Sequence, residues 1–126
     1  MRVLVIDDEK NLADTLVWIL ERAGFDATAA YDGESALQRL DAFQPDVVIS
    51  DVIMPGVNGI EVCTRIQARF PKCHILLFSG QTATNELLGE AREHGLTWEL
   101  LAKPMDPDEL LAKVTTLAQK SESAGV

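Results

Sequence analysis

The chain has 126 residues, 47% of them hydrophobic and 25% charged, and its formal net charge is −9. This length suits one domain, and we expect no second folded output module within it. A surface this acidic repels nucleic acid and anionic lipid, so we expect neither direct nucleic-acid binding nor membrane insertion. No apolar run approaches the ~18 residues of a membrane span or has the form of a signal peptide, and we therefore expect a cytoplasmic protein.

Apolar β-branched runs alternate with segments of helical period along the whole chain. In chain order we expect a strand at Val3–Ile6, a helix at Asn11–Ala23, a strand at Asp26–Ala30, a helix at Gly33–Leu40, a strand at Val47–Ser50, a helix at Ile60–Phe70, a strand at His74–Phe78, a helix at Thr84–His94, a strand at Glu99–Ala102 and a helix at Pro107–Lys120. Residues 1–120 then form the domain. Residues 121–126 are expected to be a flexible tail or a truncated linker.

Local signals refine the ends and faces of these elements. Gly24 is a typical stop for the first helix, and Asp106 is expected to cap the last helix, with Pro107 at its first position. The strand at Asp26–Ala30 is poor in β-branched residues, which predicts an edge position. The expected inward face of the first helix consists of Leu12, Leu16, Ile19, Leu20 and Ala23.

Five strand–helix units with short connections predict an α/β fold, in which helices cover both faces of a five-stranded parallel sheet. Right-handed crossovers leave few topologies, and for five strands the flavodoxin-like order 2-1-3-4-5 is the common one. In such a sheet, binding sites form beyond the carboxyl ends of the strands, between the first and third strands.

Acidic residues follow these two strands. Asp7 and Asp8 come directly after the first strand, and Asp51 ends the third. Three like charges within a few ångströms repel one another strongly unless a cation neutralises them. An all-oxygen site with open positions suits Mg²⁺ or Mn²⁺. Asp7 and Asp8 could instead merely begin a helix, where acids are favourable, but that reading leaves the convergence with Asp51 unexplained.

The fourth and fifth strands end in Ser79 and Lys103. A phosphoryl group that reaches a carboxylate brings charge that a cation on one side and a lysine on the other can neutralise. A hydroxyl can then donate a hydrogen bond to a phosphoryl oxygen. Alone, each residue would be an ordinary surface lysine or turn serine; together they suit phosphoryl transfer.

Three separated segments resemble the signature of response-regulator receiver domains. They are VIDDE at residues 5–9, SDVIMPGVNG at 50–59 and LAKP at 101–104. The resemblance runs from Arg2 to about Ala118, and the three motifs occur in the family's order on matching strand ends. It implies a two-component signalling switch and not a turnover enzyme, although such a domain assists its own phosphotransfer and dephosphorylation.

The resemblance also implies roles for individual residues. Asp51 would accept a phosphoryl group from the phosphohistidine of a sensor histidine kinase or phosphotransfer protein, and the altered surface would be read by an unknown output partner. Asp8 and Asp51 would bind Mg²⁺ directly, Asp7 would bind it through water, and the backbone carbonyl of Ile53 would be a further ligand. Lys103 would contact the phosphoryl group.

The same resemblance assigns the readout. Ser79 would follow the phosphoryl group, and Pro104 matches a proline that the family usually joins to the lysine by a cis bond. The family usually carries Tyr or Phe three residues before the lysine, where this chain has Leu100, and Trp98 lies nearby but out of register. We therefore expect Leu100, Trp98 and Pro104 to replace the usual aromatic switch.

Three other functions compete with this one. An aspartyl-phosphate phosphatase would carry a second Asp two residues after the nucleophile, where this chain has Ile53. A flavin- or nucleotide-binding module would need a Gly/Ser/Thr-rich loop after the first strand, whereas residues 8–10 begin with two acids that would repel phosphate. A degenerate receiver that only binds partners would not need all five chemical positions.

Trp18 falls outside the apolar face of the first helix. It could be exposed and anchor a partner, or it could lie flat over a neighbouring helix. The family resemblance places the phosphodonor against this helix.

Overall fold

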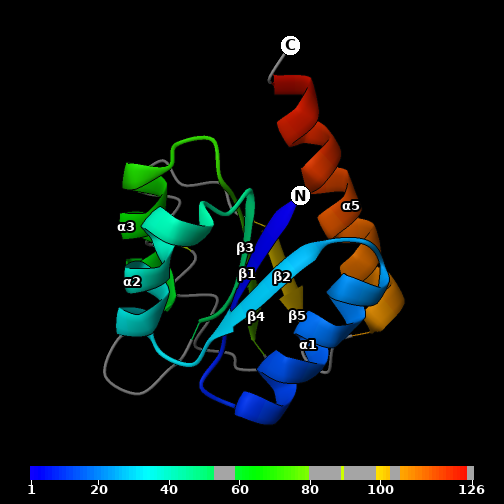
Figure 1. Ribbon diagram of the computed structural model, residues 1–126, viewed down its shortest axis with the longest axis horizontal. Coiled ribbons are helices and arrows are strands. Elements are labelled where there is room, and N and C mark those ends of the chain that lie inside the picture. Colours follow the sequence, from blue (N-terminus) through cyan, green and yellow to red (C-terminus); the bar gives the residue numbers. More distant parts are fainter. Residues whose placement is uncertain (53–58, 80–88, 90–98, 103–105, 125–126) are drawn as a thin grey trace.

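The computed structural model describes residues 1–52, 59–79, 89, 99–102 and 106–124 (Figure 1). Its elements are β1 (Arg2–Ile6), α1 (Lys10–Arg22), β2 (Asp26–Ala30), α2 (Gly33–Phe43), β3 (Val47–Asp51), α3 (Gly59–Arg69), β4 (His74–Ser79), β5 (Glu99–Ala102) and α5 (Pro107–Ala124). Apart from Gly89, the helix expected at Thr84–His94 lies outside the described residues.

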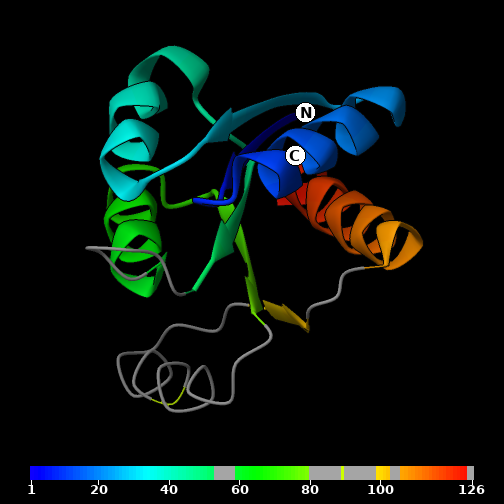
Figure 2. The same ribbon diagram turned by 90° about the horizontal axis from the view of Figure 1, so that it is seen from below.

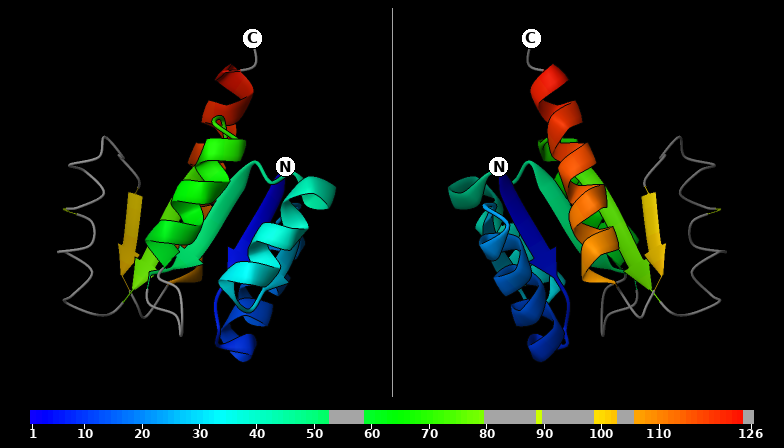
Figure 3. Two further views of the ribbon diagram at one scale, coloured as in Figure 1. Left: turned by 90° about the vertical axis from the view of Figure 1, so that its left-hand side faces the viewer. Right: turned by 90° about the vertical axis from the view of Figure 1, so that its right-hand side faces the viewer.

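The strands form one parallel sheet. β2, β1, β3 and β4 follow one another in that order, and β5 pairs with β4 on the far side. The predicted flavodoxin-like α/β fold with a parallel sheet is confirmed, as is the edge position of β2. All strands point the same way, so their carboxyl ends meet at one edge of the molecule (Figure 3).

Helices cover both faces of the sheet and create two separate cores. α1 and α5 lie on one face, and α2 and α3 lie on the other (Figure 2). Because side chains alternate along a strand, Val3 and Val5 pack with the α1 and α5 side, whereas Leu4 and Ile6 pack with the α2 and α3 side. The sheet therefore separates two apolar layers that share only its backbone.

Several expected helix ends are corrected by the structure. α1 ends at Arg22, so Ala23 is an exposed cap residue and not part of the inward face, and Gly24 takes a φ of 97° that suits glycine. The buried residue of the first turn is Ala13. α5 continues to Ala124, so most of the stretch expected to be a tail is helical.

The expected start of α5 is confirmed. The Asp108 N–H donates to Asp106 Oδ1 at 3.0 Å, which satisfies one of the amides that a helix leaves without a partner in its first turn. Pro107 then occupies the first helical position, where its missing N–H has no cost.

Both cysteines are free and buried in the core beside α3. Burial raises the pKa of the Cys63 thiol to about 12 and that of the Cys73 thiol to about 12. Both side chains therefore stay protonated at neutral pH and behave as small apolar groups. Within the described part of the chain, no helix has the length and apolar character needed to cross a bilayer.

Candidate functional site

Two neighbouring strands carry the acidic residues to one edge of the sheet. Ile6 of β1 lies opposite Ser50 of β3, so the residues that follow them, Asp7 and Asp51, emerge side by side. The Asp7 N–H donates to the Ala30 carbonyl at 3.1 Å, which extends the pairing of β1 with β2 by one residue. Strand pairing therefore fixes the backbone beneath both carboxylates.

The structure brings Asp7, Asp8 and Asp51 together. Each can place a carboxylate oxygen within 4.8 Å of the others. Asp7 has no solvent exposure and Asp51 is 6% exposed, whereas Asp8 is exposed at the rim. Two of the three charges are thus largely removed from water. Repulsion between like charges is screened least in such a buried environment.

The geometry of this cluster fits a small divalent cation. Two oxygens bound to one Mg²⁺ can be no more than about 4.2 Å apart, because each Mg–O distance is close to 2.1 Å. The oxygens of the three carboxylates lie within 4.8 Å of one another, which is slightly more than this maximum separation. Small side-chain rotations can bring them within it. The oxygen-only donor set is the one that Mg²⁺ and Mn²⁺ prefer.

A local hydrogen bond orients the innermost carboxylate. The Glu9 N–H donates to Asp7 Oδ1 at 2.9 Å, within the turn that leads into α1. This contact holds one oxygen of Asp7 toward the start of α1.

The backbone around Asp51 is held by hydrogen bonds within β3 and from the first residue of α3. The Ser50 hydroxyl donates to the Asp51 carbonyl at 3.0 Å, and the Gly59 N–H donates to the Val52 carbonyl at 2.6 Å. A Cβ on Gly59 would lie 1.9 Å from the Asp51 carbonyl oxygen and 3.0 Å from Ser50 Oγ. Only glycine lets the first residue of α3 approach this peptide so closely.

This contact was not expected, because the predicted helix begins at Ile60 and leaves Gly59 in the turn before it. The available signal was a glycine at a helix start that follows a loop of turn residues, but that pattern does not say which backbone lies nearby.

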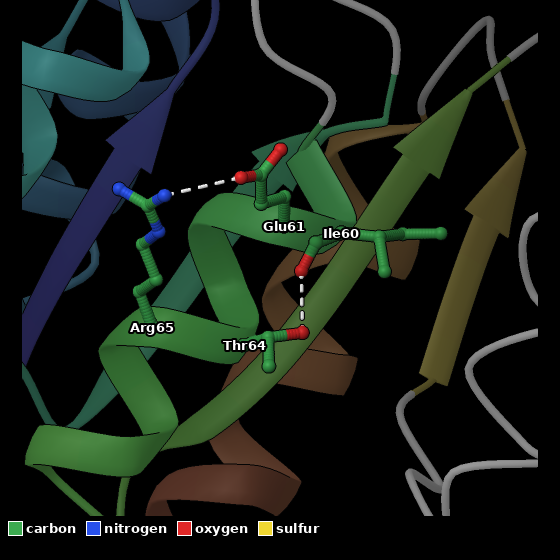
Figure 4. A network of polar contacts seen from close by, with 4 residues as sticks. All are labelled: Ile60, Glu61, Thr64 and Arg65. Atoms are coloured by element: carbon green, nitrogen blue, oxygen red, sulfur yellow. Dashed lines mark hydrogen bonds and ion pairs between the residues drawn. The ribbon is translucent and has the colours of Figure 1, made fainter.

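Further along the same helix, Arg65 pairs with Glu61 at 3.1 Å, and the Thr64 hydroxyl donates to the Ile60 carbonyl at 2.7 Å (Figure 4). Both contacts are exposed, and the Arg65–Glu61 pair stabilises the helix by only a few tenths of a kcal/mol.

The other expected site residues are only partly described. Ser79 ends β4 and lies opposite Ala102, the residue before Lys103. Leu100 lies in β5 opposite Leu77. The expected ligand Ile53, the expected phosphoryl contact Lys103 and the expected switch residues Trp98 and Pro104 lie outside the described residues.

Trp18 is exposed, as one of the two interpretations anticipated. Its side chain is 60% accessible, and the Arg22 guanidinium lies 4.8 Å from the centre of its ring.

Comparison with known proteins identifies the family. Residues 3–115 match the model of the response regulator receiver domain. The chain belongs to this family. Over 124 residues it is 34% identical to the alkaline phosphatase synthesis transcriptional regulatory protein PhoP of Bacillus subtilis strain 168. This match covers 98% of the chain and 50% of PhoP. The chain thus spans about half the length of this curated relative.

Solved structures agree with this assignment. The chemotaxis protein CheY4 of Vibrio cholerae is 29% identical, with a TM-score of 0.82 over 92% of this receiver domain and 97% of CheY4. A two-component transcriptional regulator AraC from Clostridium phytofermentans is 28% identical, with a TM-score of 0.84 over 99% and 97% of the two chains. The receiver domain described here is therefore a signalling domain of a two-component response regulator, a class that is typically not enzymatic.

Proposed function

We propose that this receiver domain accepts a phosphoryl group on Asp51 from the phosphohistidine of a sensor histidine kinase or phosphotransfer protein. The observation that carries the proposal is the convergence of Asp7, Asp8 and Asp51 at the carboxyl edge of the sheet. Asp51 ends a strand whose five residues are all buried, so its backbone is held in place. An output partner, not identified by the sequence, would read the phosphorylated surface.

The cation in this proposal is Mg²⁺ or Mn²⁺. Asp8 and Asp51 would bind it directly, Asp7 through water, and the Ile53 carbonyl would be a further ligand. When bound, the cation neutralises charge that the carboxylates and the phosphoryl oxygens would otherwise set against each other.

The transfer itself needs little from the protein beyond position and charge. A carboxylate oxygen of Asp51 attacks the phosphorus, a P–O bond forms, and the P–N bond to the imidazole breaks with its electron pair left on nitrogen. Lys103 would balance the charge of the phosphoryl oxygens, and the Ser79 hydroxyl would donate to one of them. The same groups would assist hydrolysis of the acyl phosphate by water.

Mass spectrometry tests the proposal. Incubation with acetyl phosphate and Mg²⁺ should add one phosphoryl mass to the intact chain, and peptide mapping should place it on Asp51. Chelation of the cation should prevent the addition. A phosphoryl group mapped to another residue would contradict the assignment.

We expect Mg²⁺ to raise the melting temperature, because a ligand that binds only the folded state stabilises it by mass action. At a hundredfold excess over the dissociation constant the gain is about 2.7 kcal/mol, or roughly 8–11 °C for a domain of this size. Asp8→Ala should lose most of that increase. Asp26→Ala, which removes an exposed carboxylate at the opposite end of a strand, should retain it. Equal Mg²⁺ responses in Asp8→Ala and the wild type would place the cation elsewhere.

The readout is proposed to pass through Leu100, Trp98 and Pro104. A leucine has no ring to rotate between buried and exposed positions, so we expect a small population shift around residues 80–101, with Trp98 repacking. Hydrogen exchange with and without beryllofluoride measures it. Exchange that changes only in α1 would show that the signal leaves by another face.

A further inference from the structure

The outer side of β2 presents backbone groups that the sheet does not use. β2 pairs with β1 alone in the described sheet. The Asp26 N–H donates to the Met1 carbonyl at 2.9 Å, and the Ala30 carbonyl accepts from the Asp7 N–H at 3.1 Å. In a parallel sheet, the N–H and C=O groups of one residue point to the same side of the strand, and those of the next residue point to the other side. Ala27 and Ala29 therefore direct their N–H and C=O groups outward, away from β1.

This edge lacks the usual protection. Natural sheets commonly cover an edge with lysine, proline, a bulge or another element. Residues 27–29 are alanine, threonine and alanine, and their pairing with β1 is regular. Among the described elements, none lies along the outer side of β2 (Figure 1). The side chains here are short; Ala27 is 9% exposed, and Thr28 and Ala29 are half-buried.

A groove of about 440 Å³ runs beside this edge. Residues 27–29 of β2 line it together with Val17 and Trp18 of α1. Two acids of α1, Asp14 and Glu21, also line it, together with the base Arg39 of α2. Asp14 accepts a hydrogen bond from the Tyr31 hydroxyl, and the Arg22 guanidinium lies over the Trp18 ring. The groove thus combines outward backbone groups, an exposed aromatic ring and, among the residues that line it, two acids against one base.

We propose that this groove binds an extended, basic peptide segment of a partner protein, which adds a strand beside β2. The backbone of the segment would pair with Ala27 and Ala29, as in strand addition to other open sheet edges. The face of the Trp18 ring opposite Arg22 would cover an apolar side chain of the segment. Asp14 and Glu21 would lie close to its basic side chains.

Charge selects this occupant over a second copy of the chain. Each copy carries a net charge of −9 and would bring the same two acids to the shared edge. Such an approach is repulsive, whereas a basic segment is attracted. The groove shares no residue with the phosphorylation site, so peptide binding there would be a second activity of the domain.

A model peptide tests the proposal. The probe is a capped octapeptide in which every second residue is threonine and the intervening positions alternate valine with lysine. NMR hydrogen exchange should show the Ala27 and Ala29 amides protected at least about tenfold by the bound peptide, with smaller changes elsewhere. A peptide with glutamate in place of lysine, and one with N-methylated backbone at alternate residues, should each bind at least about tenfold more weakly.

Variants at one position separate backbone pairing from other effects. Ala29→Pro removes the outward N–H at an edge position that tolerates proline and should weaken lysine-peptide binding at least about tenfold. Ala29→Ser keeps the N–H and should bind as the wild type does. Trp18→Ala should weaken binding without changing acetyl phosphate labelling. If Ala29→Pro fails to fold, the N-methylated peptide makes the same comparison on the wild-type chain.

Several results would overturn the proposal. These are equal binding of the lysine and N-methylated peptides, absence of binding by the lysine peptide, or protection that leaves Ala27 and Ala29 unchanged. Sedimentation that shows a dimer without peptide, abolished by Ala29→Pro, would assign the edge to a second copy instead.

Discussion

Asp51→Asn should lose all phosphoryl incorporation and yet melt at a higher temperature than the wild-type chain when divalent cations are absent. The amide has nearly the shape of the carboxylate but is not a nucleophile toward phosphorus. It also removes one of three negative charges whose oxygens can lie within 4.8 Å of one another. Relief of that repulsion is worth about 1–2 kcal/mol, or roughly 3–8 °C.

Intact-mass spectrometry and thermal melts in EDTA measure both effects. Asp26→Asn is the matched control, because it makes the same charge change at an exposed position where a strand begins. It should be phosphorylated normally and should melt close to the wild type. Labelling of Asp51→Asn at the wild-type yield would move the acceptor elsewhere. A lower melting temperature in EDTA would mean that the three carboxylates are not a repulsive cluster.

Gly59→Ala should destabilise the domain by about 2–4 kcal/mol, because the new methyl group has no space. Its Cβ would lie 1.9 Å from the Asp51 carbonyl oxygen, which is backbone in a strand paired on both sides. Either α3 moves outward or the Asp51 peptide is displaced. The second response would also slow phosphoryl incorporation, since it shifts the residue proposed to attack.

Denaturant unfolding and the initial rate of acetyl phosphate labelling separate these responses. Gly89→Ala is the control, because Gly89 is an exposed helical residue and an added Cβ would meet nothing within 4 Å. That variant should be as stable as the wild type or slightly more so, since alanine favours a helix over glycine. A Gly59→Ala protein that unfolds at the wild-type denaturant concentration would show that α3 can retreat at no cost.

The parallel α/β fold and the acidic cluster could be predicted because both follow from short-range patterns. Buried strands such as Val47–Ser50 are marked by β-branched runs, and the rule that parallel strands end at one edge brings Asp7 and Asp51 together. Local patterns do not predict which distant segments of the chain come into contact. They also do not predict the residue at which a helix ends. For these reasons the contact between Gly59 and the Asp51 carbonyl was missed, and Ala23 was wrongly placed on a buried face.

The last helix shows the same limit. Ser121 and the residues after it have the composition of a tail, yet the helix continues to Ala124. Small polar residues are only weakly unfavourable in a helix that is already formed, so composition alone is a poor guide to its end. The phosphoryl chemistry assigned to Lys103 and Ser79 stays a prediction.

Asp51 ends the strand that should open last. β3 is buried along all five residues and is paired on both sides, so its amides should exchange with solvent only when the whole domain unfolds. We therefore expect the backbone at Asp51 not to fluctuate independently of the fold. Core substitutions far from the site should lower phosphorylation only in proportion to the fraction of molecules they unfold, and the phosphorylation rate of each folded molecule should stay the same.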